Sequence, residues 1–217
     1  MSSWQPFSLS AAVVVASILT ALCSRAPREA KQKWGKDRLG LWATPKVSSV
    51  RRLVTVAIGV CHAIIASSSS ETNLICGHPQ NINRKLFEWN KYTTLCLFLI
   101  VAIGAPLRLL AFAQLGGNFT FQLAKPRGLT TTGVYRYIQH PGYTGQVLDG
   151  VAGCWIPQGL EARLNGWGLV CYGVVVLVMA RKVSVRVTDE EEMLKKTFGD
   201  EWVRWHTRTM RFVPGVM

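Results

Sequence analysis

A histidine, a tyrosine and two glycines occur together in the segment QHPGYTG, residues 139–145, between two apolar stretches. His140 stands directly before Pro141, and proline disfavours the α conformation of the residue that precedes it, so a helix is expected to be interrupted here. Non-helical backbone at membrane depth is tolerated only where protein or a polar cavity satisfies it. The segment therefore predicts a polar binding site without naming its ligand.

A second group of polar residues follows the last apolar stretch and includes Arg186 and Glu190. These two residues share one face if the preceding helix continues through them. Alternatively, Thr188 or Asp189 caps a new helix whose first turns carry the following acids. The simplest interpretation of the pair is a surface ion pair worth about 0.5 kcal/mol. The functional interpretation is a ligand held between this acidic segment and residues 128–145.

Two further charges, Arg108 and Asp149, lie within or beside apolar stretches. Charges inside a membrane are functional candidates by default. Arg108 can instead extend to the membrane interface, and Asp149 can pair with Arg108 or with His140, two turns before it. These alternatives stay open. The other histidines, His62, His78 and His206, have no suggestive neighbours and are interpreted as incidental.

The elements that must position these residues are apolar. Hydrophobic residues make up 49% of the 217 residues and charged residues only 17%, below the usual quarter. We predict an all-α, polytopic membrane helical bundle in a single domain, 1–217, with about five transmembrane helices. Residues 1–115 carry three spans, and residues 116–217 carry the polar segment, a helical hairpin and a C-terminal tail. The predicted spans are 7–23, 53–66, 92–115, 143–156 and 167–180, with a kink expected at Pro106.

The formal net charge of +13 is unevenly distributed. Twenty of the 25 Lys and Arg residues lie in the loop between the first two spans, in residues 116–141 or in the tail. The positive-inside rule therefore places these three parts in the cytosol, with the N-terminus outside. On a soluble protein this charge would suggest nucleic acid, but flanking basic residues that fix topology explain it better, so no nucleic-acid partner is expected.

The chain has six cysteines, none of them in a CxxC or other metal-ligand spacing. They are Cys23, Cys61, Cys76, Cys96, Cys154 and Cys171, and five of them lie in apolar stretches. Cysteine in such stretches behaves as a small hydrophobic residue. We expect neither a disulfide framework nor a bound metal.

Three blocks of the sequence resemble the isoprenylcysteine carboxyl methyltransferase family. The usual family pattern is close to LVTxGxYxxxRHPxYxG followed by RxxxEExxLxxxFGxxY. The matching blocks are LGGNFTF (115–121), GLTTTGVYRYIQHPGYTG (128–145) and RVTDEEEMLKKTFGDEW (186–202). The resemblance implies an S-adenosylmethionine-dependent enzyme of the endoplasmic reticulum membrane whose active site faces the cytosol. The implied reaction methylates the C-terminal carboxylate of a prenylated cysteine on CaaX proteins.

Site residues follow from the resemblance position by position. Arg186 corresponds to a substrate-binding arginine, and Arg186, Glu190 and His140 are the implied catalytic residues. The implied cofactor contacts are Gln122, Arg127, Gly128, Leu129, Thr130, Tyr135, His140, Pro141, Gly142, Tyr143 and Glu190. The chain departs from the family pattern at four positions. Gln139 replaces the arginine before His-Pro, and the other three departures are Thr130, Gly142 and Trp202.

The implied chemistry suits these residue types, because a carboxylate is already ionised at pH 7 and needs no general base. Its attack on a cationic sulfonium dissipates charge, so a dry site that aligns the reactants favours the reaction. One alternative is a related membrane methyltransferase acting on a phospholipid amine, for which Asp149 is a candidate base. A second alternative is a non-catalytic lipid-binding scaffold.

Overall fold

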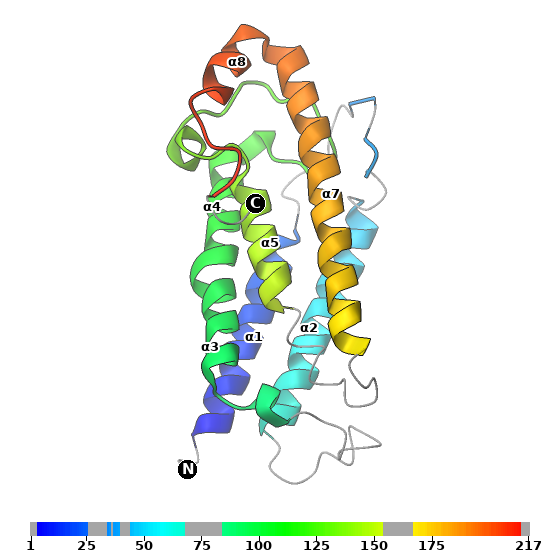
Figure 1. The fold of residues 1–217 in the computed structure, drawn as a ribbon, viewed down its shortest axis with the longest axis vertical. Helices are drawn as coiled ribbons and strands as arrows, with labels where there is room; N and C mark the ends of the chain where they lie inside the picture. The colour runs from blue at the N-terminus through cyan, green and yellow to red at the C-terminus, as the bar shows by residue number, and fades with distance from the viewer. Residues whose placement is uncertain are drawn as a thin grey trace.

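The computed structural model describes residues 4–25, 34–35, 37–39, 44–67, 84–153 and 167–213. Within these residues every regular element is a helix, and the only β pairing is one isolated bridge between Ile138 and Met210. The long helices run side by side as a bundle (Figure 1). The α-helices are α1 (Gln5–Cys23), α2 (Pro45–Ser67), α3 (Lys91–Phe98), α4 (Ala105–Leu115), α5 (Pro141–Gly153), α7 (Trp167–Phe198) and α8 (Asp200–His206). A π-helical stretch, η5 (Leu99–Gly104), and the short 3-10 turns η4 (Arg84–Phe87), η6 (Gly116–Asn118) and η7 (Gly133–Arg136) complete the set.

The predicted all-helical membrane fold is confirmed at this level. Among the described residues, three helices are long and apolar enough to cross a membrane, namely Gln5–Cys23, Pro45–Ser67 and Lys91–Asn118. The predicted fourth span overlaps α5, and the predicted fifth span lies in the first part of α7. The hairpin turn between them, like Cys76, Cys154 and His78, lies outside the described residues, so the number of five spans stays a prediction.

The first two spans form a tightly packed hairpin. Ser10 Oγ in α1 donates to the carbonyl of Ala63 in α2 at 2.8 Å. A Cβ atom at Gly59 would overlap Ser17, so this close approach requires glycine. The buried core beside the hairpin joins α1 to the third span and α5 through Leu9, Val13, Ala16, Cys96, Leu97, Ile100 and Ala152.

The distortion expected near Pro106 takes the form of the π-helical stretch η5 directly before it. Proline lacks an N–H group, and its ring clashes with the carbonyl four residues earlier, so the helix widens there. The Ala105 N–H accordingly bonds to Ile100, five residues back. A Cβ atom at Gly145 would overlap the Gly104 carbonyl, so α5 packs closely against this widened turn.

The alternative that Thr188 or Asp189 caps a new helix is wrong. Both residues lie inside α7, which continues from Trp167 to Phe198, and Thr188 Oγ1 donates to the Ser184 carbonyl within it. The helix ends instead at Gly199, whose positive φ of 50° suits glycine. Arg186 and Glu190 therefore lie one turn apart on a single helix, which confirms the hypothesis that the helix of the last apolar stretch continues through them.

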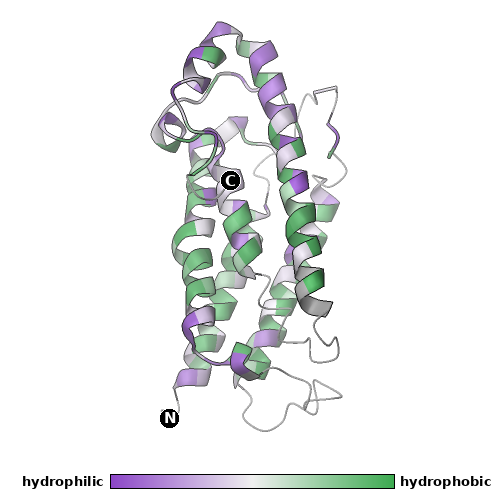
Figure 2. Ribbon diagram, viewed as in Figure 1, coloured by the Kyte–Doolittle hydropathy of each residue, from purple (hydrophilic) through white to green (hydrophobic). Residues whose placement is uncertain are grey.

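The polar parts of the chain meet at one end of the bundle. Figure 2 shows hydrophobic residues along the middle of the helices and hydrophilic residues gathered at the end that carries α8. The loop after α1 reaches this end, where the Trp34 N–H donates to Leu123 O at 2.8 Å and Arg38 pairs with Asp189 at 2.5 Å. The loop, residues 116–140 and the C-terminal tail are therefore neighbours, as predicted from charge.

Candidate active site

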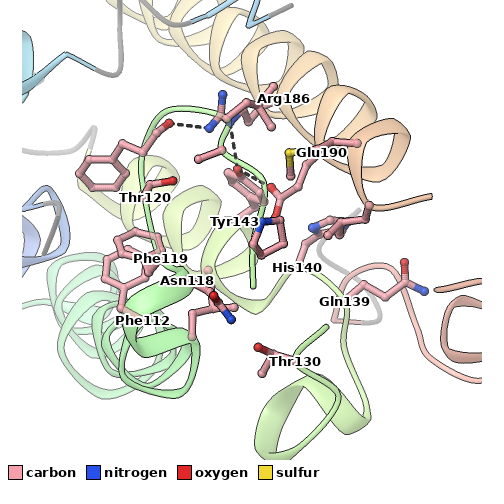
Figure 3. A pocket seen from close by; sticks show the side chains of 18 of the residues that line it. Phe112, Asn118, Phe119, Thr120, Thr130, Gln139, His140, Tyr143, Arg186 and Glu190 are labelled. Atoms are coloured by element: carbon pink, nitrogen blue, oxygen red, sulfur yellow. Dashed lines mark hydrogen bonds between the residues drawn. The ribbon is translucent and has the colours of Figure 1, made fainter. Parts of the chain in front are cut away.

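A cavity of about 250 Å³ lies where residues 116–140 meet α4, α5 and α7. Figure 3 shows side chains from all four parts of the chain around it. Ten of the predicted site residues line the cavity: Gln122, Gly128, Leu129, Thr130, Tyr135, His140, Gly142, Tyr143, Arg186 and Glu190. Arg127 and Pro141 are not among its lining residues. The Arg127 N–H bonds to Asn118 instead, and Pro141 is fully buried where α5 begins.

The non-helical backbone before α5 is satisfied by the C-terminal tail. The N–H of Gln139 donates to Met210 O at 2.8 Å, and that of His140 donates to Arg211 O at 3.1 Å. Trp205 Nε1 donates to Tyr135 O at 2.8 Å. Pro141 then starts α5, so the segment QHPGYTG both ends the irregular stretch and turns Tyr143 toward the cavity.

One chain of contacts on the cavity wall joins α5 to α7. Tyr143 Oη donates to Glu190 Oε2 at 2.8 Å, and Arg186 Nε lies 3.4 Å from the same phenol oxygen (Figure 3). Tyr143 therefore bridges an acid and a base that are one helical turn apart. This arrangement is not a simple surface ion pair, because both charges line a cavity and Arg186 is only 8% exposed.

The Arg186 guanidinium is held on two further sides. Nη2 donates to Phe121 O at 2.5 Å, and Nη1 lies 2.9 Å from Asp37 Oδ1. Asp37 is itself fixed by the N–H groups of Leu39 and Leu123. Nη1 is buried and, despite the ion pair, makes no hydrogen bond of good geometry among the described residues. Sequence reasoning missed Asp37, whose only signal was an acid in an otherwise basic loop.

His140 forms a second polar cluster at the cavity edge. Its Nε2 lies 3.0 Å from Glu191 Oε1, and Glu191 also accepts two hydrogen bonds of 2.8 Å from Arg211. Burial acts to raise the pKa of Glu191, but the hydrogen bonds from His140 and Arg211 outweigh it, so that the net pKa lies below 4.5. Glu191 was hidden in the sequence by the run of acids around it.

Gln139, which replaces the arginine of the family pattern, attaches the C-terminal tail to the segment before α5. Its Nε2 donates to the carbonyls of His206 and Thr209, and its Oε1 lies 2.8 Å from His206 Nδ1. His206 also stacks on Trp202 with ring centres 4.3 Å apart. The interpretation of His206 as incidental is therefore wrong, because it pairs with a residue of the cavity wall.

The open alternatives for Arg108 and Asp149 are also resolved. Arg108 does not extend to an interface, since it is 7% exposed, bonds to the Cys23 and Gly142 carbonyls and lines the cavity. Asp149 forms no ion pair with any described residue. Its Oδ1 has no hydrogen-bond partner there and packs against Gly104, outside the cavity lining.

Phenylalanines and short polar side chains complete the wall. Phe112 and Phe119 stack with ring centres 3.8 Å apart, and Phe121 meets both edge-on. Asn118 and Phe119 belong to the block LGGNFTF, which the family resemblance had marked without assigning a role to either. Phe112 had no signal beyond its apolar span.

Comparison with known proteins supports the resemblance seen in the sequence. Residues 94–196 match the model of the Isoprenylcysteine carboxyl methyltransferase (ICMT) family. A protein-S-isoprenylcysteine O-methyltransferase of Schizosaccharomyces pombe is 29% identical over 132 residues, which are 59% of this chain and 52% of that protein. A probable protein-S-isoprenylcysteine O-methyltransferase of Oryza sativa subsp. indica is 31% identical over 54% of this chain and 58% of its own length. The family resemblance is thereby confirmed over the matched region.

The fold is similar to a solved structure described as the eukaryotic intramembrane Ras methyltransferase ICMT. The two structures superpose with a TM-score of 0.52 and 18% sequence identity, over 82% of this chain and 70% of the other. The chain spans between about half and three fifths of the length of the two curated relatives described above. The matched region, 94–196, contains α4, α5, the segment between them and the part of α7 that carries Arg186 and Glu190.

Proposed function

We propose that this protein transfers a methyl group from S-adenosylmethionine to the C-terminal carboxylate of a prenylated cysteine. The observation that carries the proposal is the cavity wall on which Tyr143 bridges Glu190 and Arg186. The similarity to curated isoprenylcysteine methyltransferases supports the same reaction. As sites of action we propose the endoplasmic reticulum membrane and a cavity that opens to the cytosol, as the distribution of basic residues suggests.

The cavity has the chemical groups that S-adenosylmethionine requires. Glu190 offers carboxylate oxygen to the amino and hydroxyl groups of such a ligand, and His140 and Thr130 add polar edges. Phe112, Phe119 and Trp205 offer flat apolar walls for a purine ring. Arg186 lines the cavity and brings a positive charge for an acidic group, although its Nη1 also pairs with Asp37. The residues present therefore fit this cofactor together with a carboxylate substrate.

When bound, S-adenosylmethionine supplies a methyl group on a positively charged sulfur. Arg186 binds the substrate carboxylate, because a guanidinium fork can donate two parallel hydrogen bonds to it. Glu190, which accepts a hydrogen bond from the same Tyr143 hydroxyl, holds the cofactor. Both side chains are fixed by partners before the ligands arrive, so they orient the reactants rather than reorganise around them. The apolar walls exclude water, which favours a reaction that dissipates charge.

A carboxylate acceptor requires no general base, since it is ionised at pH 7. The alternative acceptor, a phospholipid amine, must lose a proton. The base suggested for it was Asp149, which lies outside the cavity lining. With its candidate base outside the lining, the amine alternative has less support, and we therefore favour the carboxylate.

The experiment is a methyl-transfer assay in membranes that contain the protein. Labelled S-adenosylmethionine is supplied with either a farnesylated cysteine analogue or phosphatidylethanolamine. We expect label on the cysteine analogue that is released by base, as a methyl ester is, and none above background on the lipid. Base-stable label on the lipid would favour the amine alternative. No label on either acceptor would favour the non-catalytic scaffold.

A further inference from the structure

Arg108 is a buried arginine on the cavity wall, and its hydrogen bonds to the described residues all go to neutral groups. Its Nε donates to Cys23 O at 3.1 Å, at the end of α1. Its Nη1 donates to Gly142 O at 2.7 Å and to Gln146 Oε1 at 2.9 Å, both in α5. These bonds fix the plane of the guanidinium. The remaining nitrogen, Nη2, donates to none of the described residues.

Arg108 makes no direct ion pair with an acid in the described part of the chain, although Asp149 is near enough to interact with it electrostatically. The other buried arginine of the cavity, Arg186, is paired with Asp37. An isolated charge is costly to bury unless a partner compensates it. The cavity wall therefore presents a fixed positive charge that suits an anionic group on a ligand.

The surroundings of Arg108 favour a single anionic oxygen. Because Nε and both N–H groups of Nη1 already have acceptors, only Nη2 remains to donate to a carboxylate oxygen. The Phe112 ring lies 5.0 Å from Arg108 Cζ and flanks the guanidinium. Phe112, Gly142 and Gln146 all line the same cavity, so an anion at Arg108 would lie within it rather than in a separate pocket.

We propose that Arg108 is a second carboxylate-binding residue of the cavity. The inference rests on the proposed function, in which each of two ligands has a carboxylate: the amino-acid part of the cofactor and the C-terminus of the prenylcysteine. Two buried arginines, Arg186 and Arg108, are available for these two groups. Arg108 binds one of them, and the experiment below determines which.

Two substitutions test the proposal without relying on the same structural contacts. Arg108→Gln removes the charge but also loses the bonds to α1 and α5. Gln146→Glu keeps Arg108 and all its bonds, and places an internal carboxylate beside Nη1 with almost no change in shape. If Arg108 binds a ligand carboxylate, Gln146→Glu competes for it. If Arg108 only joins helices, Gln146→Glu should change the affinity for each ligand and for its counterpart without a carboxylate to the same extent.

The measurement is the dissociation constant of each ligand and of its counterpart without a carboxylate, by calorimetry on the purified full chain. S-adenosylhomocysteine is compared with its decarboxylated analogue, and a farnesylcysteine with its C-terminal amide. In the wild type we expect the carboxylate to strengthen binding of one ligand through Arg108 by about tenfold to a hundredfold. Arg108→Gln and Gln146→Glu should both abolish that difference for the same ligand.

Arg208→Gln, which removes an exposed arginine of the tail, is the matched control and should retain the wild-type differences. The proposal is overturned if both variants keep the full carboxylate preference for both ligands. It is also overturned if each variant weakens the binding of a ligand and of its analogue without a carboxylate equally. If Arg108→Gln does not fold, Gln146→Glu decides by itself. A wild type that binds neither ligand would contradict the proposed function and this inference together, whereas normal binding with unchanged preferences contradicts only the inference.

Discussion

At the scale of single residues, Tyr143 separates two charges that we expect to serve different ligands. Glu190→Gln should weaken cofactor binding, because it removes the negative charge and changes the acceptor of the Tyr143 hydroxyl. Losing one charge-assisted hydrogen bond costs about 1.5–3 kcal/mol, or tenfold to hundredfold in affinity. The check is the cofactor dissociation constant, and a wild-type value would remove Glu190 from the cofactor site.

The complementary change, Arg186→Lys, should leave cofactor affinity nearly intact. It should raise the prenylcysteine concentration needed for half-maximal rate or slow turnover, since lysine cannot form the two-pronged bond to a carboxylate. Steady-state kinetics measured beside Glu190→Gln in the same detergent test this. Equal loss of cofactor binding in both variants would still place both residues in the site. It would contradict the proposal that Glu190 binds the cofactor and Arg186 binds the substrate.

His140 is expected to contact the cofactor and also contacts Glu191. His140→Ala should therefore weaken cofactor binding by about tenfold to a hundredfold. Glu191→Gln is the matched variant, because it disturbs the same contact from the side of α7 that does not line the cavity. If both substitutions weaken cofactor binding equally, His140 acts by holding the tail in place and not by contacting the cofactor.

Much of the site could be predicted from residue types in the matching blocks, because the cofactor-side residues are close together in sequence. Asp37 and Glu191 could not. Asp37 lies 149 positions before Arg186, in a loop whose basic composition concealed it, and nothing local indicates that pairing. Glu191 stands in a run of four acids, where only the fold decides which one meets His140.

At the scale of elements, the continuous helix α7 and the C-terminal tail enclose the segment before α5. Glu191 connects the three, through His140 on one side and Arg211 on the other. The sequence predicted that the tail meets this segment. It did not predict where α7 ends. Thr188 and Asp189 are good capping residues and indicated a helix start, but α7 continues past both of them.

This connection should depend on pH. The pKa of Glu191 in the folded protein lies below its ordinary 4.5, so its contribution to stability is present above about pH 4.5 and is lost as the pH falls through the lower folded value. Wild type should exceed Glu191→Gln in stability at pH 7 by about 1 kcal/mol, given the partial exposure of the pair. Thermal unfolding of both in detergent checks this. A gap that does not shrink below pH 4.5 would contradict it.

At the scale of the whole molecule, the cavity lies at the end of the bundle where the first loop, residues 116–140 and the tail meet. The apolar periodicity predicted this helical bundle, and the charge distribution predicted which loops are neighbours. Neither could predict the cavity, because its walls come from parts of the chain as far apart as Leu39, α4, residues 118–140, α5, α7 and Trp205.

We expect that whole end to face the cytosol. Single cysteines replacing Arg208, near α8, and Lys85, near the opposite end, report on the two sides. In sealed microsomes, a membrane-impermeant maleimide should label the Arg208 position from outside and the Lys85 position only after permeabilisation. The reverse pattern would overturn the proposed orientation without affecting the site.

The central claim is that this cavity brings a methyl donor to a prenylcysteine carboxylate. The most direct test is mass spectrometry of farnesylcysteine after incubation with the purified protein and S-adenosylmethionine that carries a deuterated methyl group. We predict one deuterated methyl group on the carboxylate, with the yield strongly reduced in Glu190→Gln and in Arg186→Lys. An unmodified carboxylate with wild-type protein that binds both ligands, or equal yield from all three proteins, would contradict the account.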